Sequence, residues 1–178
     1  TFVDLSLEEF LKVAKKTYTS DNGALMLDLS EAMLEASQNV VEQLEAKSKL
    51  KTAEAVNIAG RQRMLSQRVA KYYIAHKAGF QDPNTVQQLQ KSVKDFESAL
   101  RWLKEQPKNT PQLQTELANV DQLWETFRKI YVDVTNNNLP LIVFVTADKI
   151  MDNMNQITAM YAALYADIEP AKPEAAKK

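Results

Sequence analysis

Apolar residues recur every three to four positions along almost the whole chain, which is the pattern of helices rather than of strands. The first such stripe covers residues 5–18, and Ser6 with Glu9 three residues later forms a capping-box pattern at its start. Residues 20–23 then interrupt the stripe, where Asn22 or Gly23 can take a positive φ. The sequence predicts a short N-terminal helix followed by a turn.

The next stretch, residues 24–78, contains no proline, and Gly60 is its only glycine. The apolar stripe continues through it, so we predict one very long helix. A helix of about 50 residues extends roughly 75 Å. Because that length exceeds one compact bundle, we expect its N-terminal half to project or to pair with another chain.

Three further helices are predicted, one after each of the breaks at residues 79–83, 107–111 and 136–140. The first runs from residue 84 or 85 to about 106, the second from Pro111 to the break at Asn136, and the third from about 141 to 168. Thr110 is a natural N-cap, and Pro111 suits the first helical position.

The expected fold class is all-α, a four-helix bundle with one very long helix and a short extra N-terminal helix. We divide the chain into an N-terminal helix and turn (1–23), the bundle (24–168) and a low-complexity, disordered tail (169–178). The residues expected to face the bundle interior are Phe96, Leu100, Trp124, Phe127, Met154 and Ile157.

Composition narrows the chemistry. The absence of cysteine excludes disulfides, thiolate metal sites and a cysteine nucleophile. The single histidine, His76, excludes a site built mainly of imidazoles, and we expect it to be a surface or helix-end residue rather than a ligand. No glycine-rich phosphate loop or nucleophile elbow is present, and no apolar run approaches the ~20 residues of a membrane span. We therefore expect a non-enzymatic chain without a cofactor or metal.

Charge is unevenly distributed. The net charge is −1, yet the segment from Lys47 to Lys77 carries eight lysines and arginines and one acidic residue, Glu54. Such a segment indicates either an anionic partner or the solvated face of a helix. Charge alone favours the solvated face, and we expect no nucleic-acid partner.

The most informative segment surrounds Gly60, since glycine in mid-helix costs about 1 kcal/mol relative to alanine. At about 100° per residue, one broad arc around this glycine holds two amides, three arginines and a methionine: Asn57, Arg61, Arg63, Met64, Gln67 and Arg68. Arginine offers planar, bidentate donors that suit nitrate, carboxylate or phosphate. Alternatively, Gly60 only allows helices to cross and the arginines are solvated; the residues alone favour both interpretations equally.

This segment, Gly60-Arg-Gln-Arg-Met-Leu-Ser-Gln-Arg68 preceded by Asn57-Ile-Ala, closely resembles the signature helix of PilJ-type domains. These are the N-terminal sensor domains of type IV pili methyl-accepting chemotaxis transducers. The segment is similar, more loosely, to the signature helix of nitrate/nitrite sensor kinases. Weaker similarity at Trp124-x-x-Phe127 and Met151-x-x-Met-Asn155 extends the resemblance over roughly residues 50–165.

The resemblance implies a bacterial periplasmic or extracytoplasmic four-helix bundle, often dimeric, that serves signal transduction or chemotaxis. In nitrate-binding members a small anion lies between two copies of the signature helix, held by the arginine three positions after the glycine, here Arg63, and by backbone near Gly60. We therefore expect a small anion, nitrate or nitrite, as ligand and a homodimer through this helix. The expected binding residues are Gly60, Arg63, Asn57, Arg61, Met64, Gln67 and Arg68.

Two features depart from a complete transducer, since the chain has no flanking membrane helices and adds about fifty residues before the signature. We interpret it as an excised ectodomain or a free-standing periplasmic protein. The alternative function is a structural or interaction module that docks a partner protein through the long helix, with Gly60 and Arg63 making helix–helix contacts.

Overall fold

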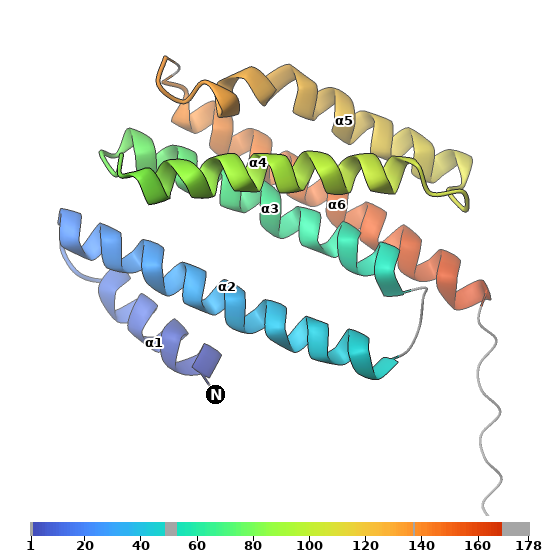
Figure 1. Ribbon diagram of the computed structural model, residues 1–178, viewed down its shortest axis with the longest axis horizontal. Helices are drawn as coiled ribbons and strands as arrows, with labels where there is room; N and C mark the ends of the chain where they lie inside the picture. The colour runs from blue at the N-terminus through green and yellow to red at the C-terminus, as the bar shows by residue number, and fades with distance from the viewer. Residues whose placement is uncertain (1, 49–52, 137, 169–178) are drawn as a thin grey trace, which may run out of the picture. The chain divides into compact units, whose positions relative to one another are not determined.

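The computed structural model describes residues 2–48, 53–136 and 138–168, and these residues form α-helices and no strand (Figure 1). The expected all-α class is confirmed. The helices of the described residues are α1 (Phe2–Ala14), α2 (Ser20–Ser48), α3 (Ala53–Lys77), α4 (Pro83–Lys104), α5 (Pro111–Val132) and α6 (Pro140–Ile168).

The chain divides into two compact units, residues 1–51 and 52–178. In the first, α1 packs against α2. In the second, α3 packs against α4, α4 against α5, α5 against α6, and α6 against α3, so each helix has two neighbours. We call this closed arrangement of four helices, from α3 through α6, the α3–α6 ring. It encloses the main hydrophobic core.

One continuous helix over residues 24–78 is not confirmed. The described residues form two helices, α2 and α3, that belong to different units, and residues 49–52 between them lie outside the described part. Within the first unit α1 packs against α2, and residues 20–23 belong to α2 itself. The tail expected at residues 169–178 also lies outside the described residues.

The predicted break at residues 20–23 is wrong, because these residues form the first turn of α2 and the interruption lies at residues 15–19. Thr19 provides the cap: its Oγ1 accepts a hydrogen bond from the backbone N–H of Asn22 at 3.1 Å. The carbonyl of Thr19 accepts another from Gly23 at 2.9 Å. The hydroxyl of Thr19 thus satisfies an N–H group that would otherwise be unpaired, and Gly23 needs no positive φ.

The predicted end of α3 at Gly79 is confirmed. Gly79 has φ 104°, a conformation that costs little only for glycine. Its N–H donates to the His76 carbonyl at 3.2 Å, and the N–H of Phe80 donates to the carbonyl of Ala75 at 3.0 Å. This pair of bonds is a Schellman motif, which satisfies the last carbonyls of a helix.

The starts of α4 and α5 follow the caps in the sequence. The side chain of Asp82 accepts from the N–H of Thr85 at 3.1 Å, with Pro83 at the first helical position. Thr110 accepts from Leu113 at 3.2 Å, again followed by a proline. Both prolines occupy sites where a backbone N–H is not needed.

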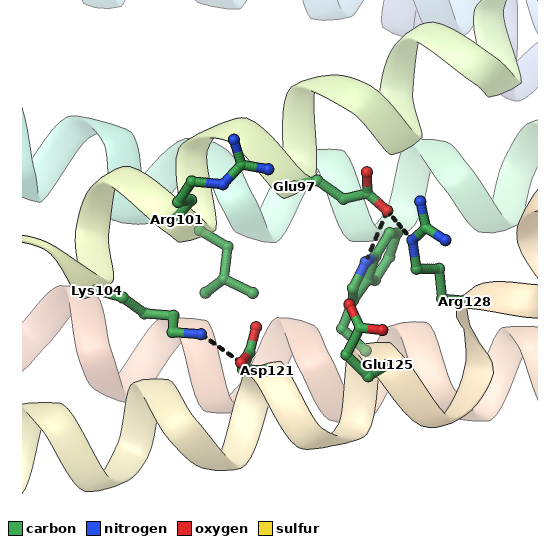
Figure 2. A pocket seen from close by; sticks show the side chains of 8 residues that line it. Glu97, Arg101, Lys104, Asp121, Glu125 and Arg128 are labelled. Carbon is green, nitrogen blue, oxygen red and sulfur yellow. Dashed lines mark hydrogen bonds and ion pairs between the residues drawn. The ribbon is translucent and has the colours of Figure 1, made fainter.

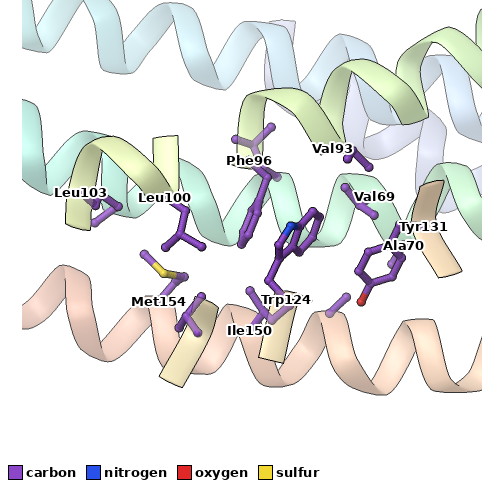
Figure 3. Packing of buried hydrophobic residues seen from close by; sticks show 14 of the residues in the cluster. Val69, Ala70, Val93, Phe96, Leu100, Leu103, Trp124, Tyr131, Ile150 and Met154 are labelled. Carbon is purple, nitrogen blue, oxygen red and sulfur yellow. The ribbon is translucent and has the colours of Figure 1, made fainter. Parts of the chain in front are cut away.

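The core of the α3–α6 ring is centred on Trp124 (Figure 3). Its ring stacks on Phe96 with centroids 4.1 Å apart and lies 5.1 Å from Tyr131. Five of the expected core residues are at most 2% exposed: Phe96, Leu100, Trp124, Met154 and Ile157. Phe127 is a correction, since it is only partly buried against the core. It lies about 60° around α5 from Trp124, at the margin of the buried stripe.

Three polar side chains of α3 are buried, those of Gln62, Ser66 and His76. Gln62 is fully buried and its Nε2 donates to the carbonyl of Phe96 on α4 at 2.9 Å. His76 lies at the end of α3, as expected, but it is not a surface residue, since only 8% of it is exposed. Packing of the last turn of α3 into the core draws His76 inside.

Truncation of Trp124 to alanine should lower the free energy of unfolding by about 3–5 kcal/mol, because it removes a fully buried aromatic ring and leaves a cavity. Phe127→Ala on the same helix is the matched control and should cost clearly less. Urea denaturation followed by circular dichroism measures both. A loss below roughly 1 kcal/mol for Trp124→Ala would contradict its central position.

Candidate functional site

One face of the α3–α6 ring is hollowed between α3 and α6. We call this open pocket of about 440 Å³ the α3–α6 groove. Its lining residues are Gly60, Arg63, Met64 and Gln67 from α3 and Met151, Asp152 and Asn155 from α6. The two helices that form it are neighbours in the ring, so the groove is built on rigid elements.

Arg63 is held in position by two hydrogen bonds. Its Nε donates to the carbonyl of Gly60 at 3.2 Å, and its Nη1 donates to Oδ1 of Asn155 at 2.7 Å. Its Nη2 has no hydrogen-bond partner among the described residues. The guanidinium is therefore oriented by both helices while one of its donor groups stays open toward the groove.

Gly60 is not required by packing within the α3–α6 ring. A Cβ at this position would lie 3.6 Å from Nη2 of Arg63 and 4.0 Å from Cγ2 of Thr158, which are ordinary contact distances. An alanine would fit, although a mid-helix glycine costs about 1 kcal/mol. Helix crossing inside this unit therefore does not explain the glycine.

The remaining groove residues give it a mixed character. Gln67 Nε2 donates to Oδ1 of Asp148 on α6 at 2.8 Å, a second polar link between the helices. Met64 and Met151 supply apolar surface, while Asp152 places a carboxylate in the same lining as Arg63. These two lining charges are opposite, so together they add no net charge to the groove.

Three of the seven residues expected at the site do not line the groove. Arg61 is exposed, and Asn57 lies outside the lining. Arg68 turns toward α4, where its Nη2 donates to Oε1 of Gln88 at 2.8 Å and its guanidinium lies 5.8 Å from the centre of the Tyr72 ring. The arc around Gly60 is so broad that its residues face different neighbours: Arg63 faces α6, whereas Arg68 faces α4.

Sequence reasoning did not select Met151, Asp152 and Asn155 as site residues. The only signal was the Met151-x-x-Met-Asn155 pattern, which served as weak family similarity. Asn155 meets Arg63 because of the axial register between α3 and α6, two helices that are far apart in the sequence. The apolar pattern of a single helix carries no information about that register. Of the other basic residues in the segment, Lys49 and Lys51 lie outside the described residues.

Other site classes find no support in the part of the chain that the structure describes. It holds no cluster of three or more histidine, aspartate or glutamate side chains that could bind a metal ion. Nor is any described helix both long and apolar enough to cross a bilayer.

Comparison with known proteins agrees with the signature segment. The family model described as "PilJ: Type IV pili methyl-accepting chemotaxis transducer N-term" matches residues 44–150, more than half of the chain. The match includes Gly60 and Arg63 and ends within α6, just before Met151. No curated protein and no solved structure matches the chain, so the similarity to nitrate/nitrite sensor kinases is not confirmed. The chain belongs to the PilJ family of chemotaxis transducer N-terminal domains.

Proposed function

We propose that this chain is the ligand-binding part of an extracytoplasmic receptor and that the α3–α6 groove recognises a small planar anion such as nitrate or nitrite. Membership of the PilJ family makes it a sensor-type signalling module. The position of Arg63 carries the proposal of a small anion: its side chain is fixed to Gly60 and Asn155, and its Nη2 is open beside the partly buried Gly60.

The fixed guanidinium lowers the entropic cost of binding, because the side chain is already ordered before the ligand arrives. A planar monoanion can accept hydrogen bonds from the open Nη2 while its other atoms approach the backbone at Gly60. Asp152 opposes additional negative charge, so the groove should favour a monoanion over a multiply charged ligand.

A second copy of the chain completes this proposed site. The groove is open, and its lining contains one arginine. A two-fold axis along α3 brings two Arg63 side chains together over one ligand. The two cations repel each other without an anion, so anion binding and dimerisation are thermodynamically linked.

A second candidate function is docking of a partner helix on the same groove. It is favoured by the lack of any packing reason for Gly60 within the ring and by the flexible, apolar side chains of Met64 and Met151. In this alternative Arg63 bonds to the partner chain, and no small molecule is involved.

Arg63→Ala should abolish anion binding while leaving helix content unchanged. Arg63→Lys should weaken binding at least about tenfold, since an ammonium lacks the planar pair of donors. Isothermal titration of nitrate, nitrite and acetate against the parent and both variants measures this. Arg61→Ala is the matched control, because Arg61 is exposed and outside the groove, and it should bind almost like the parent.

Two outcomes would overturn the anion site. The parent protein binds none of the three anions, or Arg63→Ala binds them as well as the parent does. Either result makes partner docking the better account of the groove.

Gly60→Ala should raise the free energy of unfolding by about 0.5–1 kcal/mol, because it removes the entropic cost of a mid-helix glycine without creating a clash. The same substitution should weaken anion binding or dimerisation, since the methyl group fills the space beside Nη2. Urea denaturation and analytical ultracentrifugation with and without nitrate measure the two effects. A destabilised variant would instead show that packing inside the ring needs the glycine.

A further inference from the structure

A second pocket lies between α4 and α5, two helices that take no part in the α3–α6 groove. We call this cavity of about 230 Å³ the α4–α5 pocket (Figure 2). Its lining residues are Glu97, Leu100, Arg101 and Lys104 from α4 and Asp121, Trp124, Glu125 and Arg128 from α5. Three cations and three anions therefore surround a floor made by Leu100 and Trp124.

Ion pairs between the two helices close both ends of this pocket. At one end Nε of Arg128 lies 2.5 Å from Oε1 of Glu97, and the indole Nε1 of Trp124 donates to the same oxygen at 3.3 Å. At the other end Lys104 pairs with Asp121. Figure 2 shows these links as dashed lines on either side of the pocket. The four ions at the ends are thus neutralised in pairs.

The middle of the pocket carries one more cation and one more anion. Along their helices, Arg101 of α4 and Glu125 of α5 both lie between the two ion pairs that join Glu97 to Arg128 and Lys104 to Asp121. No ion pair joins Arg101 to Glu125 or to any other described residue. The pKa of Arg128 is raised mainly by the hydrogen bond between Arg128 and Glu97. The negative charge of Glu125 raises this pKa further, by a smaller amount.

We propose that the α4–α5 pocket binds a small zwitterion, such as a free α-amino acid, with its carboxylate on Arg101 and its ammonium on Glu125. A ligand with both charges bridges two side chains that do not reach each other directly. A ligand with only a negative charge is repelled by Glu97, Asp121 and Glu125. A ligand with only a positive charge is repelled by the three basic side chains of the lining. The volume lies below the 300–1,000 Å³ typical of pockets for drug-sized ligands, so only a small molecule fits.

Fluorescence of Trp124, at the floor of the pocket, tests the proposal. The chain has two tryptophans, so Trp102→Phe leaves Trp124 as the only indole. Alanine should give a saturable change with a dissociation constant of about 0.1–1 mM. Acetate and ethylamine, which each carry one of its charges, should bind at least about tenfold more weakly at constant ionic strength. Calorimetry of alanine with the unsubstituted protein gives the same information if the Trp102→Phe variant does not fold.

Arg101→Gln and Glu125→Gln should each weaken alanine binding at least about tenfold, because each removes one charge-assisted contact. Lys94→Gln on α4 and Glu116→Gln on α5 are matched controls outside the pocket and should bind like the parent. Arg63→Ala should also bind alanine normally, so failure of the anion site and failure of this site are distinguishable. The proposal is overturned if alanine gives no saturable response up to about 10 mM, if acetate binds as tightly as alanine, or if the two glutamine variants at Arg101 and Glu125 retain parental affinity.

Discussion

The packing of α3 between α4 and α6 is the constraint on which the site depends. The face of α3 that carries Ala59, Leu65 and Val69 is almost completely buried, so its rotation about its own axis is fixed. With that face inside, Gly60 and Arg63 fall on the side next to α6, whereas Arg68 falls on the side next to α4. Hydrophobic burial therefore selects which of three neighbouring arginines can serve the groove.

A buried hydrogen bond makes this rotation specific. Gln62 immediately precedes Arg63 and donates to the backbone of Phe96 in an environment without exposed surface. A rotation of α3 that broke this bond would leave a buried donor unsatisfied, at a cost of roughly 1–3 kcal/mol. Apolar contacts alone tolerate small rotations more readily, so the amide adds precision to the placement of Arg63.

Local signals predicted local structure well. Gly79 and Thr110 marked helix ends because a positive φ and an N-cap depend on neighbouring residues only. The signature segment was recognisable for the same reason, since its residues are contiguous. The turn assigned to residues 20–23 failed because the hydroxyl of Thr19 caps a helix that begins one residue later. Periodicity predicts which face of each helix is buried, but it does not predict the axial register between helices. The hydrogen bond between Arg63 and Asn155 depends on that register, so only the structure reveals it.

The two proposed sites lie between different pairs of helices, and a series of hydrogen bonds and ring contacts connects them. Glu97 of the α4–α5 pocket accepts a hydrogen bond from Trp124, whose ring stacks on Phe96. The carbonyl of Phe96 in turn holds Gln62, the residue before Arg63. A ligand that shifts Trp124 would act on α3 through these contacts. Thermodynamic linkage then requires reciprocity: any factor by which a zwitterion changes anion affinity must equal the factor by which the anion changes zwitterion affinity.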